Sequence, residues 1–165
     1  MDKRISAAAR EVARFGVLGG LTFAAKLVLS PLPNIEPVSL LVMLFAVTFG
    51  KKALFPIYIY VLLELSVFGL GLWSAAYLYI WAILALAACL LRRMESPLGW
   101  AILSGTFGLL FGGLCAPVCL LAGGPAFAWS WWLSGIPFDL AHCGGNFALA
   151  LVLFRPARRL LERLA

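Results

Sequence analysis

Apolar residues occur in long runs along the chain, and prolines, glycines and basic pairs separate one run from the next. A bilayer core of about 30 Å is crossed by a helix of roughly 17–25 apolar residues. The pattern therefore predicts an all-α integral membrane bundle of six transmembrane helices, forming one domain over residues 1–165. The expected spans are about 9–30, 37–50, 53–71, 74–91, 97–122 and 138–154, followed by an amphipathic tail over 155–165.

The interruptions set the expected ends of these spans. Pro31 and Pro33 follow the first span and cannot continue its helix. Lys51 and Lys52 close the second span, which is short for a complete crossing. The sequence Gly-Gly-Pro after the fifth span predicts a loop over 123–137.

The composition agrees with a membrane protein. Hydrophobic residues make up 64% of the chain and charged residues 12%, with a mean hydropathy of +1.02. A soluble protein of this size could not cover its surface with so few polar side chains. These values exclude a soluble enzyme, a disordered segment, a coiled coil and a disulfide-rich secreted domain. A polar, basic N-terminus before an overlong apolar run is also untypical of a cleavable signal peptide.

The net charge of +6 reflects topology more than a nucleic-acid partner, because basic residues gather between the apolar runs. Lys and Arg mark the cytoplasmic side of membrane helices. With six spans and both termini cytoplasmic, all inner segments are basic and the outer segments contain no Lys or Arg. Twelve basic residues lie in the inner segments or at the inner ends of the spans, and Lys26 is the one that does not. The inner positions are Lys3, Arg4, Arg10, Arg14, Lys51, Lys52, Arg92, Arg93, Arg155, Arg158, Arg159 and Arg163.

The expected outer side combines aromatic and polar residues. Trp and Tyr commonly anchor helices at the membrane interface. An aromatic pocket with a few convergent polar groups is also typical of a small-molecule site. Both interpretations apply to this group, which contains Asn34, Glu36, Trp73, Tyr77, Trp129, Trp131, Trp132, Asp139 and His142.

Polar residues within the spans require partners, because an unpaired charge in a bilayer is unfavourable by several kcal/mol. Glu64 and Lys26 are the main cases, and a pair of Lys26 with Glu64 or Glu36 would neutralise both partners. Such a pair could be purely structural, Lys26 could extend to the interface, or these groups could face a ligand cavity. Asp139, His142 and Asn146 form a second polar stripe along one helical face.

Two spans carry small residues every fourth position, a spacing that allows close helix–helix approach. In the fifth span this face predicts contact within the chain. In the first span, contact within the chain and docking onto another membrane protein are equally supported. The faces are Ser104, Gly108, Gly112 and Ala116, and Gly16, Gly20 and Ala24.

The chain lacks the common catalytic and metal-binding motifs, including HExxH, GxSxG and the P-loop. The single histidine cannot form a multi-histidine metal site, and the four cysteines lie in apolar stretches where Cys usually acts as a small hydrophobe. We therefore expect no enzyme activity, no catalytic residue, no metal and no cofactor.

The sequence resembles one protein family. The likeness rests on four short stretches, a basic N-terminus and a small-residue face on the first of six short helices. The family is the substrate-binding S component of an energy-coupling factor (ECF) vitamin transporter, and the likeness covers nearly the whole chain. The stretches are LPNIEPVSLL at 32–41, FGKKAL at 49–54, LLE at 62–64 and GLGLW at 69–73.

The resemblance implies that the chain captures a vitamin or related micronutrient from outside for ATP-driven uptake. Its partners would be a membrane coupling (T) subunit and two ATPase subunits, in the cytoplasmic membrane of a prokaryote. In the family an AxxxA-type face contacts the coupling subunit; here that face contains glycine at Gly16 and Gly20, followed by Ala24. The first outer loop would act as a lid. Substrate-binding candidates are Asn34, Glu36, Glu64, Trp73, Tyr77, Trp129, Trp132, Asp139, His142 and Asn146.

The cargo class and other functions stay open at this point. The scarcity of outer basic residues favours a neutral or cationic, aromatic cargo; cobalamin, pyridoxine-like and pyrimidine-like compounds are candidates by analogy. A ligand-free membrane scaffold or a small proton-coupled carrier would also account for the polar stripes. An intramembrane enzyme using Asp139, His142 and Glu64 is disfavoured, because no nucleophile stands at a recognisable spacing from a base.

Overall fold

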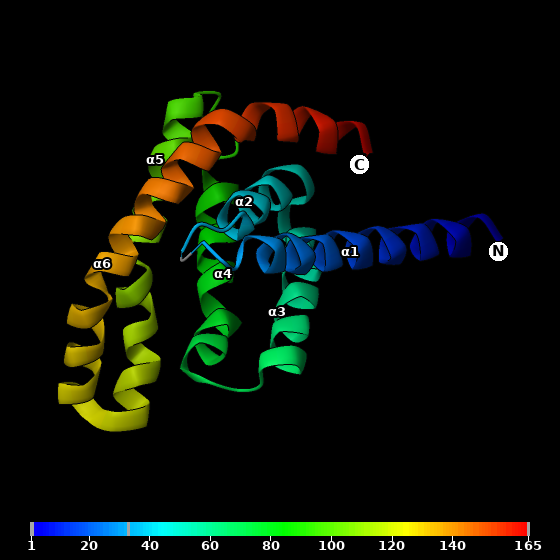
Figure 1. The fold of residues 1–165 in the computed structure, drawn as a ribbon. Coiled ribbons are helices and arrows are strands. Elements are labelled where there is room, and N and C mark those ends of the chain that lie inside the picture. The colour runs from blue at the N-terminus through cyan, green and yellow to red at the C-terminus, as the bar shows by residue number, and fades with distance from the viewer. Residues whose placement is uncertain (1, 33, 165) are drawn as a thin grey trace.

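The computed structural model describes residues 2–32 and 34–164, with side chains described over 7–32 and 34–163. The expected helix-ending residue Pro33 and the expected inner positions Lys3 and Arg4 lie outside the described residues or side chains. The described part of the chain is helical apart from turns and short connections (Figure 1). Its elements are α1 (Asp2–Leu29), α2 (Val38–Phe49), the 3-10 turn η1 (Gly50–Ala53), α3 (Leu54–Phe68), α4 (Leu72–Leu90), α5 (Pro97–Leu109) and α6 (Phe111–Leu164).

The short helix α2 forms the centre of the bundle. It contacts α4 and α6 extensively, and most of its residues are buried. Its sequence is apolar around its whole circumference, as expected for a helix surrounded by other helices. Large side chains from α3, α4 and α5 complete the core, among them Tyr60, Trp81 and Trp100.

Within the part of the chain that the structure describes, four helical stretches are long and apolar enough to cross a membrane. The expected spans 37–50, 53–71 and 74–91 agree with α2, α3 and α4 to within a few residues. The first two of these form one continuous stretch, because η1 joins α2 to α3 without a loop. The four stretches are Ala7–Leu29, Val38–Phe68, Leu72–Leu90 and Pro97–Arg163.

The prediction of a loop over 123–137 is wrong, because this segment is helical within α6. Gly124 has φ 79° and ψ −177°, a conformation that favours glycine and kinks the helix. Pro125 follows, and proline is tolerated in the first turn of a helix. The chain therefore reverses without a loop, and Figure 1 shows the two arms of α6 on either side of the yellow bend.

The expected span 97–122 contains a short interruption that the sequence did not predict. The helix is interrupted at Leu110, between α5 and α6. The Gly112 amide donates to the Asp139 carboxylate, with N–O distances of 3.0 and 3.2 Å. We attribute the break to this contact, because it takes the amide at the start of α6 away from the helical pattern.

The glycines of α1 divide into packed and open positions. A Cβ at Gly19 would lie 2.6 Å from Ile59 Cγ2 and 2.8 Å from the Pro56 carbonyl oxygen, so Gly19 lets α1 approach α3 closely. A Cβ at Gly16 or Gly20 would meet nothing within 4 Å. The small-residue face of the first span is therefore not the face that α1 packs against α3.

The small-residue face of the fifth span lies within the bundle, as the sequence predicts. A Cβ at Gly108 would lie 2.8 Å from the backbone of His142, and one at Gly112 would lie 2.5 Å from Asp139 Oδ2. Ser104 is fully buried. This face therefore holds α5 and the start of α6 against the returning arm of α6.

Candidate functional site

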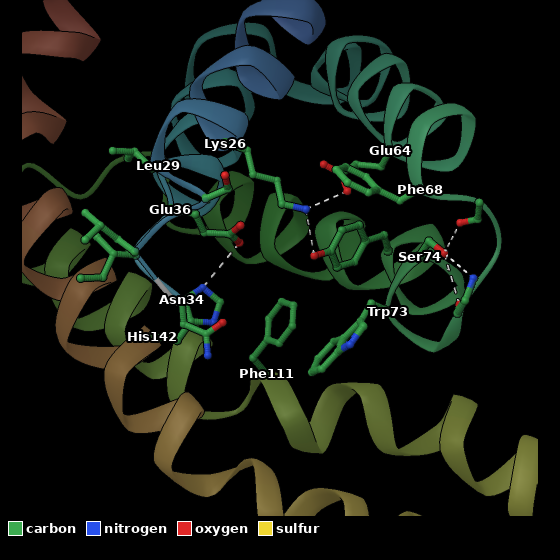
Figure 2. Close-up of a pocket in the computed structure, with 16 residues that line it drawn as sticks. Lys26, Leu29, Asn34, Glu36, Glu64, Phe68, Trp73, Ser74, Phe111 and His142 are labelled. Carbon is green, nitrogen blue, oxygen red and sulfur yellow. Dashed lines mark hydrogen bonds and ion pairs between the residues drawn. The ribbon is translucent and has the colours of Figure 1, made fainter.

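A cavity of about 530 Å³ lies where the α1–α2 connection meets the α3–α4 turn and both arms of α6 (Figure 2). Polar and aromatic side chains from distant parts of the sequence meet here. The lining residues are Lys26, Leu29, Ser30, Leu32, Asn34, Ile35, Glu36, Glu64, Phe68, Gly69, Gly71, Trp73, Ser74, Tyr77, Phe111 and His142.

An ion pair between α1 and α3 forms one side of the cavity. Lys26 Nζ lies 2.7 Å from Glu64 Oε2 and 3.5 Å from the Tyr77 hydroxyl. It also lies 5.1 Å from the centre of the Tyr77 ring, within the range of a cation–π contact. Glu64 is almost completely buried, with 4% of its side chain exposed. The sequence left Glu64 and Glu36 as possible partners of Lys26, and the structure pairs it with Glu64.

The pair leaves one polar atom unused. Glu64 Oε1 is buried and has no hydrogen-bond partner among the described residues. A buried carboxylate oxygen without a partner is unfavourable by roughly 1–3 kcal/mol or more. A hydrogen-bond donor on a bound molecule would satisfy it.

Glu36 and His142 face each other across the opposite side of the cavity (Figure 2). His142 Nε2 lies 3.7 Å from Glu36 Oε1 and makes no hydrogen bond with a described residue. Phe111 packs edge-on against the imidazole, at 4.8 Å between ring centres. Burial raises the pKa of Glu36 to about 7; nearby Lys26 opposes this shift and Glu64 adds to it. Glu36 thus changes charge near neutral pH.

An aromatic wall joins these two polar groups. Trp73 and Phe111 stack with ring centres 6.1 Å apart and planes inclined by 25°. Tyr77 meets Phe111 edge-on at 6.3 Å. Trp73 is 47% exposed, so it lies at the mouth of the cavity. A flat ring inserted here would find stacking partners as well as hydrogen-bonding groups.

Local hydrogen bonds fix the rim on the α3–α4 side. Ser74 Oγ accepts from the Gly71 amide at 2.7 Å and donates to the Gly69 carbonyl oxygen at 2.8 Å. This arrangement is a capping interaction at the start of α4. It holds Trp73 at the mouth.

The opposite rim is the connection between α1 and α2. Asn34 has φ 57°, a conformation that asparagine tolerates, and its Nδ2 donates to the Phe138 carbonyl oxygen at 3.0 Å. Gly145 lets this connection approach α6, since a Cβ there would lie 3.3 Å from Ile35 Cγ1. Asn34, Ile35 and Glu36 of this connection therefore line the cavity while the connection packs on α6.

The structure brings six of the ten predicted site residues to this cavity. These are Asn34, Glu36, Glu64, Trp73, Tyr77 and His142. Sequence reasoning did not select Phe68, Ser74 or Phe111 as site residues.

The other four predicted residues lie outside the cavity lining. Trp129 and Trp132 pack edge-on against each other at 5.4 Å between ring centres, and Trp129 is 59% exposed. Asp139 accepts from the Gly112 amide. Asn146 donates to Ser39 Oγ at 2.9 Å and to the Ser104 carbonyl oxygen at 3.3 Å. Asp139 and Asn146 therefore make contacts between helices.

Within residues 2–32 and 34–164, no group of three or more His, Cys, Asp or Glu side chains could hold a metal. Comparisons of the chain with protein families, curated proteins and solved structures give no match. The functional assignment therefore depends on the cavity and on the sequence patterns.

Proposed function

We propose that this chain is the substrate-binding S component of an ECF-type transporter, a non-enzymatic protein that captures a vitamin-like molecule from outside. The observation that carries the proposal is the cavity of about 530 Å³, which lies in the usual range for small-molecule sites. It combines an aromatic wall with two buried, unpartnered polar atoms, Glu64 Oε1 and His142 Nε2. The loop resemblance at 32–41 falls on the connection that lines it.

The charges of the cavity favour a neutral or cationic cargo. Lys26 and Glu64 neutralise each other, and Glu36 adds a carboxyl group that can donate or accept a hydrogen bond near neutral pH. An anionic cargo would lack an unpaired basic partner among the lining residues. The volume and the Trp73–Phe111 wall favour a molecule of one or two rings, such as a pyridine or pyrimidine derivative, over a cobalamin.

The proposed topology has six passes with both termini in the cytoplasm. The Lys51–Lys52 pair lies in η1, where Gly50 turns the backbone with φ 57°, so the stretch 38–68 would contain two passes. The kink at Gly124 would divide the stretch 97–163 in the same way. Basic residues then face the cytoplasm, as the positive-inside rule expects.

The open face of α1 is the proposed contact with the membrane coupling subunit, which works with two ATPase subunits. Gly16 and Gly20 have free space around them, and Ala24 is exposed. Small residues allow a second helix to approach closely in a membrane. Gly20→Leu should abolish co-purification of the coupling subunit while preserving the fold; Gly144→Leu, also in open space, is the matched control. Equal capture by both variants would contradict this docking face.

Tryptophan fluorescence tests cargo binding directly. Titration of the purified protein with neutral and cationic vitamins should change the emission of Trp73, and Trp73→Phe should remove that change. Trp129→Phe should retain it, because Trp129 lies outside the cavity lining. Two results would favour a membrane scaffold. One is that no vitamin changes the fluorescence; the other is that Glu36→Ala unfolds the protein and no ligand binds the wild-type protein.

A small proton-coupled carrier is a second candidate. It is favoured by the position of Glu36, whose pKa is about 7, opposite His142 at 3.7 Å. This function predicts uptake into proteoliposomes driven by a pH gradient without ATPase subunits. Uptake that requires both ATP and the partner subunits would exclude it.

A further inference from the structure

A second cavity, of about 610 Å³, lies at the arginine-rich end of the bundle. It forms between the α4–α5 connection and the last turns of α6, which lie together at the top of Figure 1. Two segments distant in the sequence supply its charged groups. Its basic lining residues are Arg92, Arg93, Arg155, Arg158 and Arg159.

The positive charge of this cavity is only partly compensated. Five arginines and two glutamates give the lining a formal net charge of +3. Arg158 pairs with Glu162 at 2.7 Å, while Arg155 donates to the backbone carbonyl oxygen of Glu95 and not to its carboxylate. Among the described residues, Arg92, Arg93 and Arg159 make no side-chain hydrogen bond or ion pair. Three guanidinium groups are therefore available to an anion.

The floor of the cavity is rigid and aromatic. Trp100 and Phe154 stack with ring centres 4.3 Å apart and planes inclined by 13°, and each is 1% exposed. Trp100 Nε1 donates to the Met94 carbonyl oxygen at 3.0 Å. This contact fixes the α4–α5 connection against α5, so the arginines extend from a fixed base.

Exposed apolar side chains also lie within a few residues of the lining on the same two helices. Leu98 and Ile102 lie on α5, and Val152 lies on α6; they are 52%, 54% and 68% exposed. These residues belong to a stretch that is long and apolar enough to cross a membrane. A molecule with an anionic head and acyl chains would match both surfaces, whereas a soluble anion would use only the arginines.

We propose that this cavity binds the phosphate headgroup of an anionic phospholipid. Guanidinium groups bind phosphate oxygens through paired hydrogen bonds, and basic pockets at the ends of membrane helices are suited to anionic headgroups. The lipid would join the α4–α5 connection to α6 at the end opposite the ligand cavity. This site is independent of the proposed transport function.

The test compares thermal stabilisation of the detergent-solubilised full chain by phosphatidylglycerol and by phosphatidylcholine. Phosphatidylglycerol should raise Tm selectively. Each basic residue near an anionic surface contributes a factor of about five in affinity. Arg93→Gln with Arg159→Gln should therefore lower the affinity for phosphatidylglycerol roughly 30-fold, so that more lipid is needed for the same Tm shift. Arg10→Gln with Arg163→Gln removes the same charge outside the cavity and should preserve it. Arg93→Lys with Arg159→Lys keeps the charge but loses the paired hydrogen bonds, so it should lower the affinity less than the glutamine variant does.

Several results would overturn the proposal. Equal stabilisation by both lipids would show that the headgroup charge is not recognised. If the cavity double variant and the Arg10/Arg163 control lose the phosphatidylglycerol-induced Tm shift equally, the attraction would depend on the overall charge of the protein and not on the cavity. Saturation of the same Tm shift by inorganic phosphate alone would assign the cavity to a soluble phosphate compound. If the cavity double variant fails to fold, a phosphatidylglycerol selectivity in the lysine double variant equal to that of the wild-type protein would contradict recognition by guanidinium groups.

Discussion

Two Lys–Glu ion pairs attach α1 to the rest of the protein, and they differ mainly in burial. Lys26–Glu64 lies in the ligand cavity, with side-chain exposures of 21% and 4%. Lys52–Glu11 joins η1 to the other end of α1, with exposures of 60% and 39%. Removing one partner of a buried pair leaves the other charge uncompensated, whereas an exposed pair contributes about 0–1 kcal/mol. The loss of one partner is therefore expected to destabilise the protein strongly at the cavity end of α1 and only slightly at its other end.

The largest expected effect follows from breaking the buried pair. Glu64→Ala leaves the Lys26 ammonium without its carboxylate partner beside Phe68 and Tyr77. We expect the free energy of unfolding to fall by about 3 kcal/mol, near the lower end of measured losses for broken buried pairs. Thermal unfolding in detergent measures this as a Tm decrease of roughly 10 °C.

A double variant sharpens this result. Lys26→Met with Glu64→Leu removes both charges, and replacing a buried pair by apolar residues is often neutral or stabilising. The double variant should therefore recover most of the lost Tm while losing ligand binding. A double variant as unstable as Glu64→Ala would contradict the assignment of the loss to an unpaired Lys26.

The next effect is the pH dependence of the free energy of unfolding, which we expect to arise from Glu36 in the ligand cavity. Lys26, Glu64, Tyr77 and His142 face Glu36 across the cavity. The pKa of Glu36 is about 7 in the folded protein, against 4.5 in its ordinary state, so the folded protein binds the extra proton between these values. Stability should fall by up to about 3 kcal/mol as pH rises through this window and level off above about pH 7.

Glu36→Gln isolates this contribution, because glutamine does not titrate. The variant should lose most of the decline in unfolding free energy between pH 5 and pH 8, measured by denaturant unfolding. Glu11→Gln is the matched control at the exposed pair and should retain the decline. An unchanged pH profile in Glu36→Gln would place the titrating group elsewhere.

A smaller effect is expected where α1 approaches α3 between the two pairs. Gly19→Ala would place a methyl group against Ile59 and the Pro56 carbonyl oxygen, and overpacking of this kind typically destabilises by about 1–3 kcal/mol. Gly20→Ala meets open space and should be neutral or slightly stabilising, because alanine favours helix. Equal Tm values for the two variants would contradict the close α1–α3 packing.

The smallest effect is expected at the exposed pair. Lys52→Ala should change the free energy of unfolding by less than about 0.5 kcal/mol, because water can replace the lost partner of Glu11. Added salt should reduce even this difference. A loss comparable with that of Glu64→Ala would show that burial does not distinguish the two pairs.

The sequence predicts the helices better than their junctions. Apolar runs and Lys or Arg pairs locate α2, α3 and α4 closely, because the patterns that end these helices are local. The helical segment 123–137 and the break at Leu110 are different. One depends on the φ of Gly124, and the other lies at the Gly112–Asp139 contact between residues far apart in the chain. The Gly-Gly-Pro sequence marks the first junction but does not show that the residues after it are helical, and the second junction has no local pattern that reveals it.

The residues of the candidate site were likewise predictable only in part. Lys26 and Glu64 are visible in the sequence, because charges within apolar runs require partners. Whether Asp139 and Asn146 face the cavity or a neighbouring helix depends on helix rotation, which the sequence does not specify. Phe111 was missed because an aromatic residue in an apolar run carries no distinguishing signal.

The central claim is that the cavity beside Lys26 and Glu64 holds a small organic molecule. Mass spectrometry of molecules released from the gently purified protein tests it most directly, with the Lys26→Met/Glu64→Leu double variant as the control. The account predicts a vitamin-like mass released by the wild-type protein and absent from the folded double variant. A wild-type protein that releases no such molecule, or equal release from both proteins, would contradict it.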